Sequence, residues 1–438
     1  MSKQNEAQVG VQNEGIRPKA RNASKMAEVS RPHFDRAYDN GLMGVSCRVR
    51  DNRRIEIATT GQEVIDYTRC GYLNLDSHPS VLAAAQASMD EIASVHFSVA
   101  RTRLSAEPLV RLESTLASLF DVESVVVFPT VAAANMGALP LLAAGLFTNG
   151  EKPLIAFDRF AHVTLQYHIP VLREETEVMV IDHNDLDHLE RLCQSGRQVA
   201  YIGDGAYSMG GAAPVRQLRA LQEKYGLFVY LDDAHGISVV GKHGEGFVRS
   251  QLDGLDDRTI VAASLGKGYG AAGGLLMLGS RKIEHAIRRY APTYGFSCAP
   301  NMAAVGAALA SAEIHRTPEL HKLQRALNNN MHLFDSLIPT ETKGSELPIR
   351  IVRIGDEMEA LAKGESLLRQ GHYASVVFFP TVPRGQAALR MAITAAHNPA
   401  DILDLSLVLR NGDNKVAAEA PAAAPASLTL PIDGEEVK

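Results

Sequence analysis

Two short polar segments, each directly after an apolar run, hold the residues of this chain that are best suited to covalent chemistry. Residues 232–236 read Asp-Asp-Ala-His-Gly, and residues 266–268 read Gly-Lys-Gly. A lysine amine can form a Schiff base with an aldehyde cofactor, and a carboxylate can keep the pyridine nitrogen of that cofactor protonated. Lysine is rarely carried into a protein core unless it is paired or chemically used. Lys267 and Asp232 therefore predict a site for pyridoxal phosphate (PLP).

Each half of this pair also has an ordinary explanation. An Asp-Asp at a strand end is commonly a helix cap or a turn, and a Gly-Lys-Gly is usually a solvated loop. The context favours a site, because residues 228–231 and 259–263 are short β-rich runs that end abruptly in small or polar residues. Asp232 and Lys267 would then lie at the carboxyl ends of parallel strands, where open α/β sheets bind their ligands.

The elements that would hold these residues form an alternation of apolar runs and helix-length amphipathic segments. This pattern is typical of an α/β protein in which helices cover both faces of a mainly parallel sheet. After a small-residue helix at 302–315, a second pattern of three strands and two helices indicates a smaller α+β domain. The seven strands expected in the large sheet are 125–128, 154–157, 177–181, 199–202, 228–231, 259–263 and 274–278. Those of the small domain are 349–354, 375–378 and 387–393, with helices at 356–370 and 399–409.

The chain accordingly divides into four parts. Residues 1–66 are an N-terminal extension, polar up to about residue 25 and expected to be partly disordered. Residues 67–317 form the large PLP-binding domain, and residues 318–413 form the small C-terminal domain. Residues 414–438 are an Ala/Pro/Glu tail that is expected to be disordered, because it cannot repay the entropy of ordering.

Composition excludes several classes of protein. At 438 residues with 46% hydrophobic content the chain can bury a large core, and a net charge of −6 gives no basic field for nucleic acid. The four cysteines are far apart, without a Cys-x-x-Cys, which argues against structural zinc and disulfides and suits a reducing cytoplasm.

Residues 125–148 are uncharged and long enough to cross a bilayer, but Pro129, Asn135 and Pro140 interrupt them. We expect a strand, a turn and a core helix there, and no membrane span.

From about Tyr67 to Leu409 the chain resembles the α-oxoamine synthases, PLP enzymes of the aspartate-aminotransferase fold (fold type I). This family includes 8-amino-7-oxononanoate synthase, 5-aminolevulinate synthase, serine palmitoyltransferase and autoinducer-type α-aminoketone synthases. Any one motif would be a weak signal, whereas their order and spacing make a strong one. The motifs are Tyr72-Leu73-Asn74-Leu75 with His78-Pro79, Phe160-Ala161-His162, Asp204-Gly205-Ala206-Tyr207-Ser208-Met209, Asp-Asp-Ala-His-Gly from Asp232, Gly-Lys-Gly-Tyr-Gly from Gly266, and Arg390.

The resemblance implies roles for residues around the cofactor ring. His162 matches the histidine that stacks on the pyridine ring, although taken alone it would be an ordinary polar residue at a helix start. Ser208 and His235 match residues that hydrogen bond around the phenolic oxygen, and Asp204 would support Ser208. A Ser or His near a strand end is more often satisfied locally. Lys267, Asp232, His162 and His235 are the expected catalytic residues.

The phosphate site departs from the family pattern, which usually has Ser-Gly and an aromatic residue after the strand. Here the sequence is Pro129-Thr130-Val131-Ala132. The backbone amides of Val131 and Ala132 could still cradle a phosphate at the start of a helix, helped by the hydroxyls of Thr130 and Ser264. Ser297 aligns with the region that reaches the phosphate of the neighbouring subunit, which implies a homodimer with the active site at the subunit interface.

Substrate contacts are implied at three arginines. Arg390 matches the small-domain arginine that holds the amino-acid carboxylate, for which a planar guanidinium is suited; a surface arginine on an edge strand is the ordinary alternative. The segment 95–103 replaces a glycine-rich stretch of 8-amino-7-oxononanoate synthase and resembles the more divergent members. Arg101 or Arg103 would there be available to a CoA phosphate near the acyl entrance, although exposed arginines usually have no such specific role.

The expected function is a PLP-dependent acyltransferase reaction. A small L-amino acid (alanine, serine or glycine) would condense with an acyl-CoA or an acyl-carrier-protein thioester, and loss of CoA and CO2 would give an α-aminoketone. The alternatives are 8-amino-7-oxononanoate synthase of biotin synthesis, an aminotransferase or lyase of the same fold, and a cofactor-free scaffold.

Two other patterns do not predict a site. Residues 268–273 spell G-x-G-x-x-G but lack the strand, loop and helix context of a dinucleotide site. Asp232, Asp233 and His235 form one cluster without a second, so we expect no metal.

Overall fold

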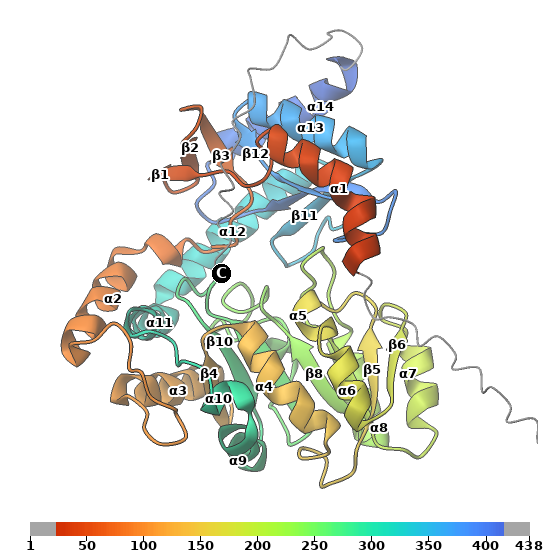
Figure 1. Cartoon of the computed structure of the whole chain (residues 1–438). Helices are drawn as coiled ribbons and strands as arrows, with labels where there is room; N and C mark the ends of the chain where they lie inside the picture. Colours follow the sequence, from red (N-terminus) through yellow and green to blue (C-terminus); the bar gives the residue numbers. More distant parts are fainter. Residues whose placement is uncertain (1–22, 416–438) are drawn as a thin grey trace, which may run out of the picture.

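The computed structural model describes the backbone of residues 23–415 and the side chains of residues 23–410. The chain folds into a large and a smaller domain, which Figure 1 shows one above the other, joined by the long helix α12 (Pro318–Leu337). Most of the polar N-terminal segment and most of the Ala/Pro tail, for which the sequence predicts disorder, lie outside the described residues.

The large domain is built on a seven-stranded sheet, and each strand expected from the sequence is present. Six strands run parallel, and β10 is antiparallel to both of its neighbours, β4 and β9. This arrangement confirms the expected α/β class with a mainly parallel sheet. In spatial order the strands are β4 (Ser124–Phe128), β10 (Gly274–Leu278), β9 (Thr259–Ser264), β8 (Phe228–Asp232), β7 (Val199–Asp204), β5 (Leu154–Asp158) and β6 (Val178–Ile181).

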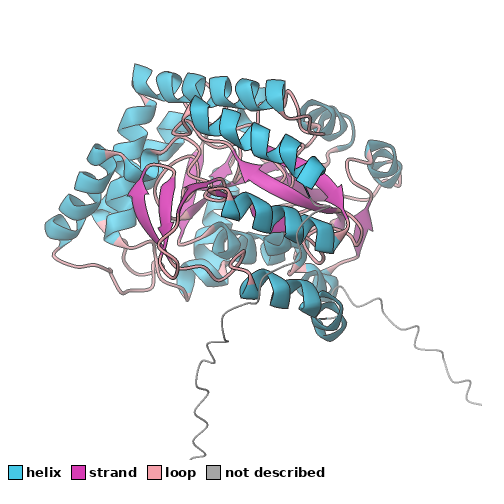
Figure 2. Cartoon of the chain, turned by 90° about the horizontal axis from the view of Figure 1, so that it is seen from above, coloured by secondary structure: helices cyan, strands magenta, loops and turns pink. Residues whose placement is uncertain are grey.

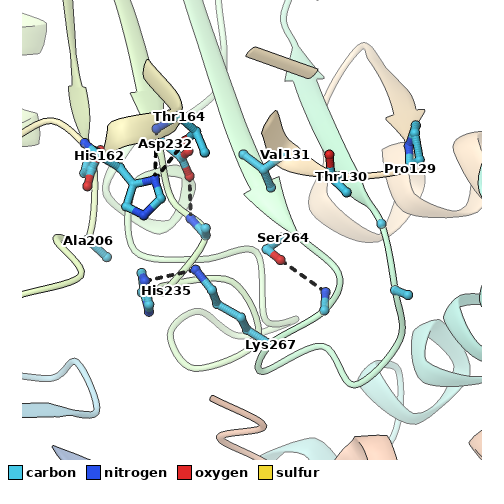
Figure 3. Close-up of a pocket in the computed structure, with 15 residues that line it drawn as sticks. Pro129, Thr130, Val131, His162, Thr164, Ala206, Asp232, His235, Ser264 and Lys267 are labelled. Carbon is cyan, nitrogen blue, oxygen red and sulfur yellow. Dashed lines mark hydrogen bonds between the residues drawn. The ribbon is translucent and has the colours of Figure 1, made fainter. Parts of the chain in front are cut away.

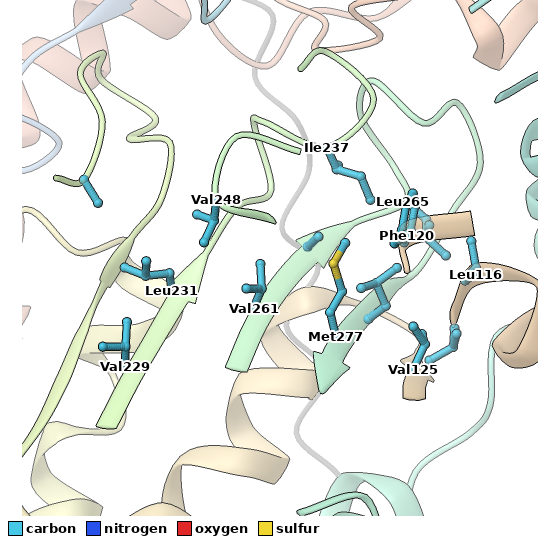
Figure 4. Packing of buried hydrophobic residues seen from close by; sticks show 14 of the residues in the cluster. Leu116, Phe120, Val125, Val229, Leu231, Ile237, Val248, Val261, Leu265 and Met277 are labelled. Carbon is cyan, nitrogen blue, oxygen red and sulfur yellow. The ribbon is translucent and has the colours of Figure 1, made fainter. Parts of the chain in front are cut away.

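Helices cover both faces of this sheet because its strands alternate apolar side chains to either side. Val229, Leu231 and Val261 point into the core that Figure 4 shows. Tyr230 and Ile260 point into the core on the opposite face. Figure 2 shows the strands enclosed between the helices. The helices that contribute to the first core include α3 (Glu107–Phe120), α8 (Val215–Tyr225) and α11 (Met302–His315), and those of the second include α4 (Val131–Ala143), α6 (Ile169–Glu175) and α9 (Arg281–Tyr290).

The remaining elements of the large domain are short or lie at its periphery. The helix α2 (Pro79–Ile92) packs along α11. The residues 125–148 fold as the strand β4, a turn and the helix α4, as expected. Within residues 23–415, no helix combines the length and the apolar character needed to cross a membrane. The short helices are α5 (Val163–Gln166), α7 (Leu186–Cys193), α10 (Pro292–Gly295), η1 (Leu75–Ser77) and η2 (Arg249–Gln251).

The smaller domain contains a three-stranded antiparallel sheet in the order β11 (Ile349–Gly355), β14 (Ala387–Ala392) and β13 (Ser375–Val377). The helices α13 (Glu357–Arg369) and α14 (Pro399–Lys415) belong to this domain. The part of the N-terminal extension that is described packs here as well. Its helix α1 (Ala23–Asp39) is tied to α13 by an ion pair of 2.8 Å between Arg36 and Glu365.

A second small sheet joins residues 47–66 to the smaller domain. Its strands β1 (Cys47–Asp51), β2 (Arg54–Ile57) and β3 (Glu63–Asp66) are antiparallel neighbours, and β12 (His372–Tyr373) adds to β3 in parallel. After Asp66 the polypeptide enters the segment 67–75, which contacts both domains, because the carbonyl of Tyr72 accepts the N–H of Ala395 and its hydroxyl meets His235. The N-terminal strands therefore help to position that segment.

Candidate active site

A pocket of about 280 Å³ opens at the carboxyl ends of the central strands. Figure 3 shows Asp232, His235 and Lys267 around it. Most of the residues that the sequence predicts to bind the cofactor line this one cavity, which is the placement expected for an open α/β sheet. They are Thr130, Val131, His162, Asp204, Asp232, His235, Ser264 and Lys267.

Lys267 lies in the turn that follows β9, and its amine points into the pocket. Its Nζ lies 2.9 Å from Nε2 of His235 (Figure 3). Burial lowers the pKa of the Lys267 amine below its ordinary value, although the carboxylates of Asp232 and Asp204 act in the opposite direction. A lowered pKa increases the neutral fraction of the amine, which is the form that attacks an aldehyde.

Asp232 ends β8 and is almost fully buried, with 4% of its surface exposed. Its Oδ1 accepts the N–H of Ala234 at 3.0 Å, and its Oδ2 accepts the side-chain amide of Asn135 at 3.3 Å. The Tyr230 hydroxyl donates to the other end of that amide at 2.8 Å. These fixed donors orient the carboxylate toward the pocket.

Asp204 ends the neighbouring strand β7, directly opposite Asp232 in the sheet. Burial and then the negative charge of Asp232 raise the pKa of Asp204 well above its ordinary value. Its Oδ1 accepts the backbone N–H of His162 at 2.9 Å. Asp204 was expected to support Ser208, whereas its carboxyl positions the backbone of His162.

His162 both caps a helix and lines the pocket. Its ring Nδ1 accepts the backbone N–H of Thr164 at 3.3 Å at the start of α5 and lies 2.8 Å from the Thr164 hydroxyl. The ordinary explanation, a polar residue at a helix start, is therefore correct, and the same side chain also lines the pocket. The cap fixes the ring where a planar cofactor could stack on it.

His235 is buried, with 6% of its surface exposed, and both of its ring nitrogens have partners. Nε2 faces Lys267, and Nδ1 lies 2.6 Å from the Tyr72 hydroxyl. Burial, followed by the positive charges of Lys267 and Arg390, lowers the pKa of His235 well below its ordinary value. The imidazole is therefore neutral at physiological pH.

The start of α4 borders the pocket at Thr130 and Val131. Thr130 is the N-cap, and its hydroxyl accepts the N–H of Ala133 at 3.0 Å. The first N–H groups of a helix have no partner within the helix, so Val131 and Ala132 can present theirs to an anion. Gly274 passes so close that a Cβ there would lie 2.3 Å from the nitrogen of Val131, which explains the glycine.

Arg390 and Ser208 lie together, beyond the residues that line the pocket. Arg390 is on β14, and its Nε donates to the backbone carbonyl of Ser208 at 2.7 Å. One of its terminal nitrogens is 3.9 Å from the sulfur of Cys70. The contact made by Ser208 is thus through its backbone, and it joins the small-domain sheet to the loop after β7.

Arg101 has a different environment from the one expected. Its guanidinium is buried, donates to Glu113 at 2.6 Å, and lies 4.3 Å from the ring centre of Tyr294. Arg288 binds the other oxygen of Glu113 at 2.8 Å. The Arg101 guanidinium therefore packs the segment 95–106 against α3 and α10, which does not agree with a contact to a CoA phosphate.

Three further predicted residues do not line the pocket. Arg103 is exposed, Ala132 is exposed on the first turn of α4, and Ser297 is half-buried after α10. The contribution of Ala132 would come from its backbone amide. The role expected for Ser297 involves a second copy of the chain, so the geometry of one protomer does not test it.

Several residues of the site could not be assigned a role from the sequence. Tyr72 belongs to a motif noticed in the sequence, but nothing there indicated that its hydroxyl meets His235. Thr164 could have been found because it follows His162 by two residues, the spacing of a helix cap. Asn135 was noted as a polar residue that interrupts the apolar run 125–148, and its bond to Asp232 depends on the packing of α4 against the sheet.

The comparisons with known proteins agree with this geometry. A family model for aminotransferase class I and II matches residues 64–406. The chain is 32% identical over 353 residues to an 8-amino-7-oxononanoate synthase of Symbiobacterium thermophilum, which covers 78% of this chain and 86% of that protein. The chain belongs to the α-oxoamine synthases. A second such relative, from Geobacter sulfurreducens, is 29% identical over 371 residues and covers 83% of this chain and 92% of its own.

Solved α-oxoamine synthase structures share the fold. Serine palmitoyltransferase from S. paucimobilis, with PLP and myriocin bound, has a TM-score of 0.78 at 21% identity and covers 90% of this chain and 99% of that chain. An 8-amino-7-oxononanoate synthase from Francisella tularensis has a TM-score of 0.66 at 19% identity and covers 80% of this chain and 98% of that chain. The protein therefore has PLP fold type I, as the sequence predicts.

The donor set of the pocket fits PLP, the cofactor of this family of acyltransferases. The amine of Lys267 suits the aldehyde, the carboxylate of Asp232 suits the ring nitrogen, and the start of α4 suits the phosphate. These three groups line one cavity. No group of three metal-ligating side chains is present within the part of the chain that the structure describes.

Proposed function

We propose that this α-oxoamine synthase condenses a small L-amino acid, namely alanine, serine or glycine, with an acyl thioester to give an α-aminoketone. The observation that carries the proposal is the single pocket that joins the Lys267 amine, the Asp232 carboxylate and the start of α4. Bound PLP supplies an electron sink for the Cα of the amino acid. Lys267 holds the cofactor, Asp232 keeps its ring nitrogen protonated, and His162 packs on the ring.

Lys267 is also the proposed base. Once the amino acid has displaced it, its Nζ removes the Cα proton, for which its lowered pKa is suited. The Cα then forms a bond with the acyl carbon, the carbon–sulfur bond breaks, and the thiol leaves with a proton. Loss of the former carboxylate as CO2 gives the α-aminoketone. Lys267 can return a proton to Cα, so the amine serves as acid and base in turn.

Arg390 is proposed to hold the amino-acid carboxylate until it leaves. Its Nε donates to the carbonyl of Ser208, which fixes one side of the guanidinium and leaves the terminal nitrogens for another partner. A guanidinium can bind a carboxylate through two nitrogens. Arg103 remains a candidate for a phosphate of the acyl donor, whereas the buried ion pair of Arg101 with Glu113 removes it from that role.

A second copy of the chain is proposed to complete the phosphate site through Ser297. Next to Ser297, Phe296 is 95% exposed, which is unusual for a large apolar side chain and suits coverage by a partner. Sedimentation of the PLP-bound protein tests for a dimer. A Ser297→Ala change should weaken PLP binding without altering the sedimentation coefficient.

The experiment that tests the reaction is a panel of amino acids and acyl-CoAs of increasing chain length, read by thiol release. A synthase releases thiol only when both substrates are present, and CO2 forms in equal amount. Thiol release that does not depend on the amino acid would contradict the proposal. Acyl groups on a carrier protein form a second arm, which shows the preferred donor.

The names of the relatives favour one specific candidate, an 8-amino-7-oxononanoate synthase. That product requires alanine and a seven-carbon acyl group with a terminal carboxylate. High thiol release with this pair alone would select it.

An aminotransferase or lyase is the other candidate, because the matching family model covers aminotransferases. Transfer of the amino group to a keto acid without thiol release would select that reaction.

A further inference from the structure

Three side chains form a continuous hydrogen-bonded row at the floor of the site. The Lys267 amine is 2.9 Å from Nε2 of His235, and Nδ1 of the same ring is 2.6 Å from the Tyr72 hydroxyl. Tyr72 has no exposed surface. Its backbone is held in place from the small domain, because its carbonyl accepts the N–H of Ala395 at 2.8 Å. Water therefore cannot replace the Tyr72 hydroxyl without a rearrangement.

A neutral imidazole carries one N–H and one lone pair, so the directions of its two hydrogen bonds depend on each other. When the Lys267 amine is protonated it can only donate, so Nε2 of His235 must accept and Nδ1–H must donate to the Tyr72 oxygen. When the amine is neutral, Nε2–H can donate to it, and Nδ1 then accepts from the Tyr72 hydroxyl. The protonated amine thus requires the tautomer with hydrogen on Nδ1, whereas the neutral amine also allows the tautomer with hydrogen on Nε2.

We propose that the Tyr72 hydroxyl, acting through the ring of His235, sets the proton affinity of the Lys267 amine. Tyr72 is then a positioning residue for the reaction, an inference that rests on the role proposed above for Lys267. The hydroxyl suits this task because it can accept or donate, so it satisfies Nδ1 in both tautomers. It allows the amine to take up and release a proton without leaving a buried ring nitrogen unpaired.

Other charged groups also face this row. The carboxyl groups of Asp232 and Asp204, from the ends of β8 and β7, face the amine, as do Cys70 and Arg390. Arg390 and His162 face the imidazole, and Cys70 and Arg390 also lie beside the Tyr72 hydroxyl. A Tyr72→Phe change leaves all of these groups in place and removes only the oxygen.

The sign of the expected effect follows from the cost of an unpaired N–H. In Tyr72→Phe, the tautomer with hydrogen on Nδ1 has a buried donor without an acceptor, so hydrogen on Nε2 is favoured. That N–H then faces the Lys267 amine, and because the protonated amine is also only a donor, its protonation becomes less favourable. An unpaired buried donor costs about 1.4 kcal/mol or more, so the midpoint for protonation of Lys267 should fall by about one pH unit.

The test uses the full chain freed of cofactor. The amine reacts with the PLP aldehyde only when it is neutral, so the rate of the absorbance change, followed against pH, has a midpoint that reports the amine. We expect the midpoint of Tyr72→Phe to lie about one unit below that of the wild type. The matched control is Tyr67→Phe, which removes another fully buried hydroxyl, bonded to the carbonyl of Asp401 at 3.1 Å. Its midpoint should equal that of the wild type.

The outcomes separate this inference from the proposed function. If Lys267→Ala takes up PLP with the same absorbance change as the wild type, the proposed function fails. If the wild type reacts through Lys267 but Tyr72→Phe keeps the wild-type midpoint, with unchanged thermal unfolding, only the role of Tyr72 is overturned. A fall in Tyr67→Phe equal to that in Tyr72→Phe would also overturn it, because the effect would then be structural.

The tautomer itself gives a second readout. In protein labelled with ¹⁵N-histidine, the signals of His235 are those that disappear in His235→Gln. At a pH between the two midpoints, where the amine is protonated in the wild type and neutral in Tyr72→Phe, the wild type should show hydrogen on Nδ1 and Tyr72→Phe should show hydrogen on Nε2. The same tautomer in both proteins would contradict the inference.

Discussion

Asn135 donates its side-chain amide to Oδ2 of Asp232 at 3.3 Å, although the two residues lie on different elements, α4 and β8. The same amide accepts the Tyr230 hydroxyl at 2.8 Å, and Asn135 has no exposed surface. The carboxylate that is proposed to keep the PLP ring nitrogen protonated is therefore held by a buried side chain that itself has little freedom to move.

Asn135→Ala should weaken PLP binding as well as stability. The carboxylate loses a donor and the buried Tyr230 hydroxyl loses its acceptor, which costs about 1–3 kcal/mol and about tenfold in PLP affinity. Urea unfolding and fluorescence titration with PLP measure the two effects. Gln222→Ala is the control, because it removes a buried amide at the opposite end of the sheet, where its partners are Arg258 and Thr259. Equal losses of PLP affinity in the two variants would contradict a role for Asn135 at the site.

Asp233 should make stability depend on pH. Burial raises the pKa of its carboxyl to about 8, helped by the charge of Asp232 and opposed by the N–H of Val248. The unfolded carboxyl loses its proton near pH 4, at about its ordinary pKa, while the folded one keeps it. Its contribution to the free energy of unfolding is therefore complete below about pH 4 and is lost as the pH rises to about 8.

The Asp233→Asn side chain resembles the neutral acid. This change should therefore reduce the dependence of the free energy of unfolding on pH, measured by urea unfolding between pH 5 and pH 8. Asp158→Asn is the contrasting variant. Burial raises the pKa of Asp158, but the bonds from His183 and from the N–H groups of Asn184 and Phe160 outweigh it and lower the pKa below its ordinary value. Its contribution is present above the ordinary pKa and is lost as the pH falls. An unchanged slope in Asp233→Asn would show that this carboxyl is ionised in the folded protein.

Arg390→Lys should raise the KM for the amino acid by about 10-fold to 100-fold, because a compact ammonium cannot bind a carboxylate through two nitrogens. PLP absorbance should be unchanged. Arg353→Lys is the control, since Arg353 lies on the adjacent strand β11 and pairs with Glu341 at 2.7 Å on the surface. Steady-state kinetics over a range of amino-acid concentrations measures KM and kcat separately for both variants. A fall in kcat at constant KM would instead assign Arg390 a role after binding.

Thr130→Ala should reduce stability by about 1 kcal/mol, the usual value of an N-cap, and Thr130→Ser should restore most of it. The hydroxyl that accepts the N–H of Ala133 also borders the pocket, so PLP affinity should fall in Thr130→Ala. Thr317→Ala removes the cap of α12, which lies outside the pocket, and should reduce stability alone. If Thr130→Ala binds PLP as tightly as the wild type, the Thr130 hydroxyl does not contribute to holding the phosphate.

The strands of the large sheet could be predicted from the sequence because each is a short apolar run, and all but the edge strand β6 are buried on both faces. The antiparallel direction of β10 could not, since the run 274–278 carries no signal of direction. Local patterns also placed Asp232 and Lys267 at strand ends. The bond between Tyr72 and His235, and the burial of Arg101 against Glu113, depend on elements distant in the sequence. Arg101 looked available only because the sequence does not show that Glu113 faces it.

The most direct test of the central claim is to reduce the PLP-bound protein with borohydride, digest it and locate the modified lysine by mass spectrometry. The account predicts that the pyridoxyl group is found on Lys267 and that Lys267→Ala carries none. Modification of another lysine at full occupancy, or none in an active protein, would contradict the account.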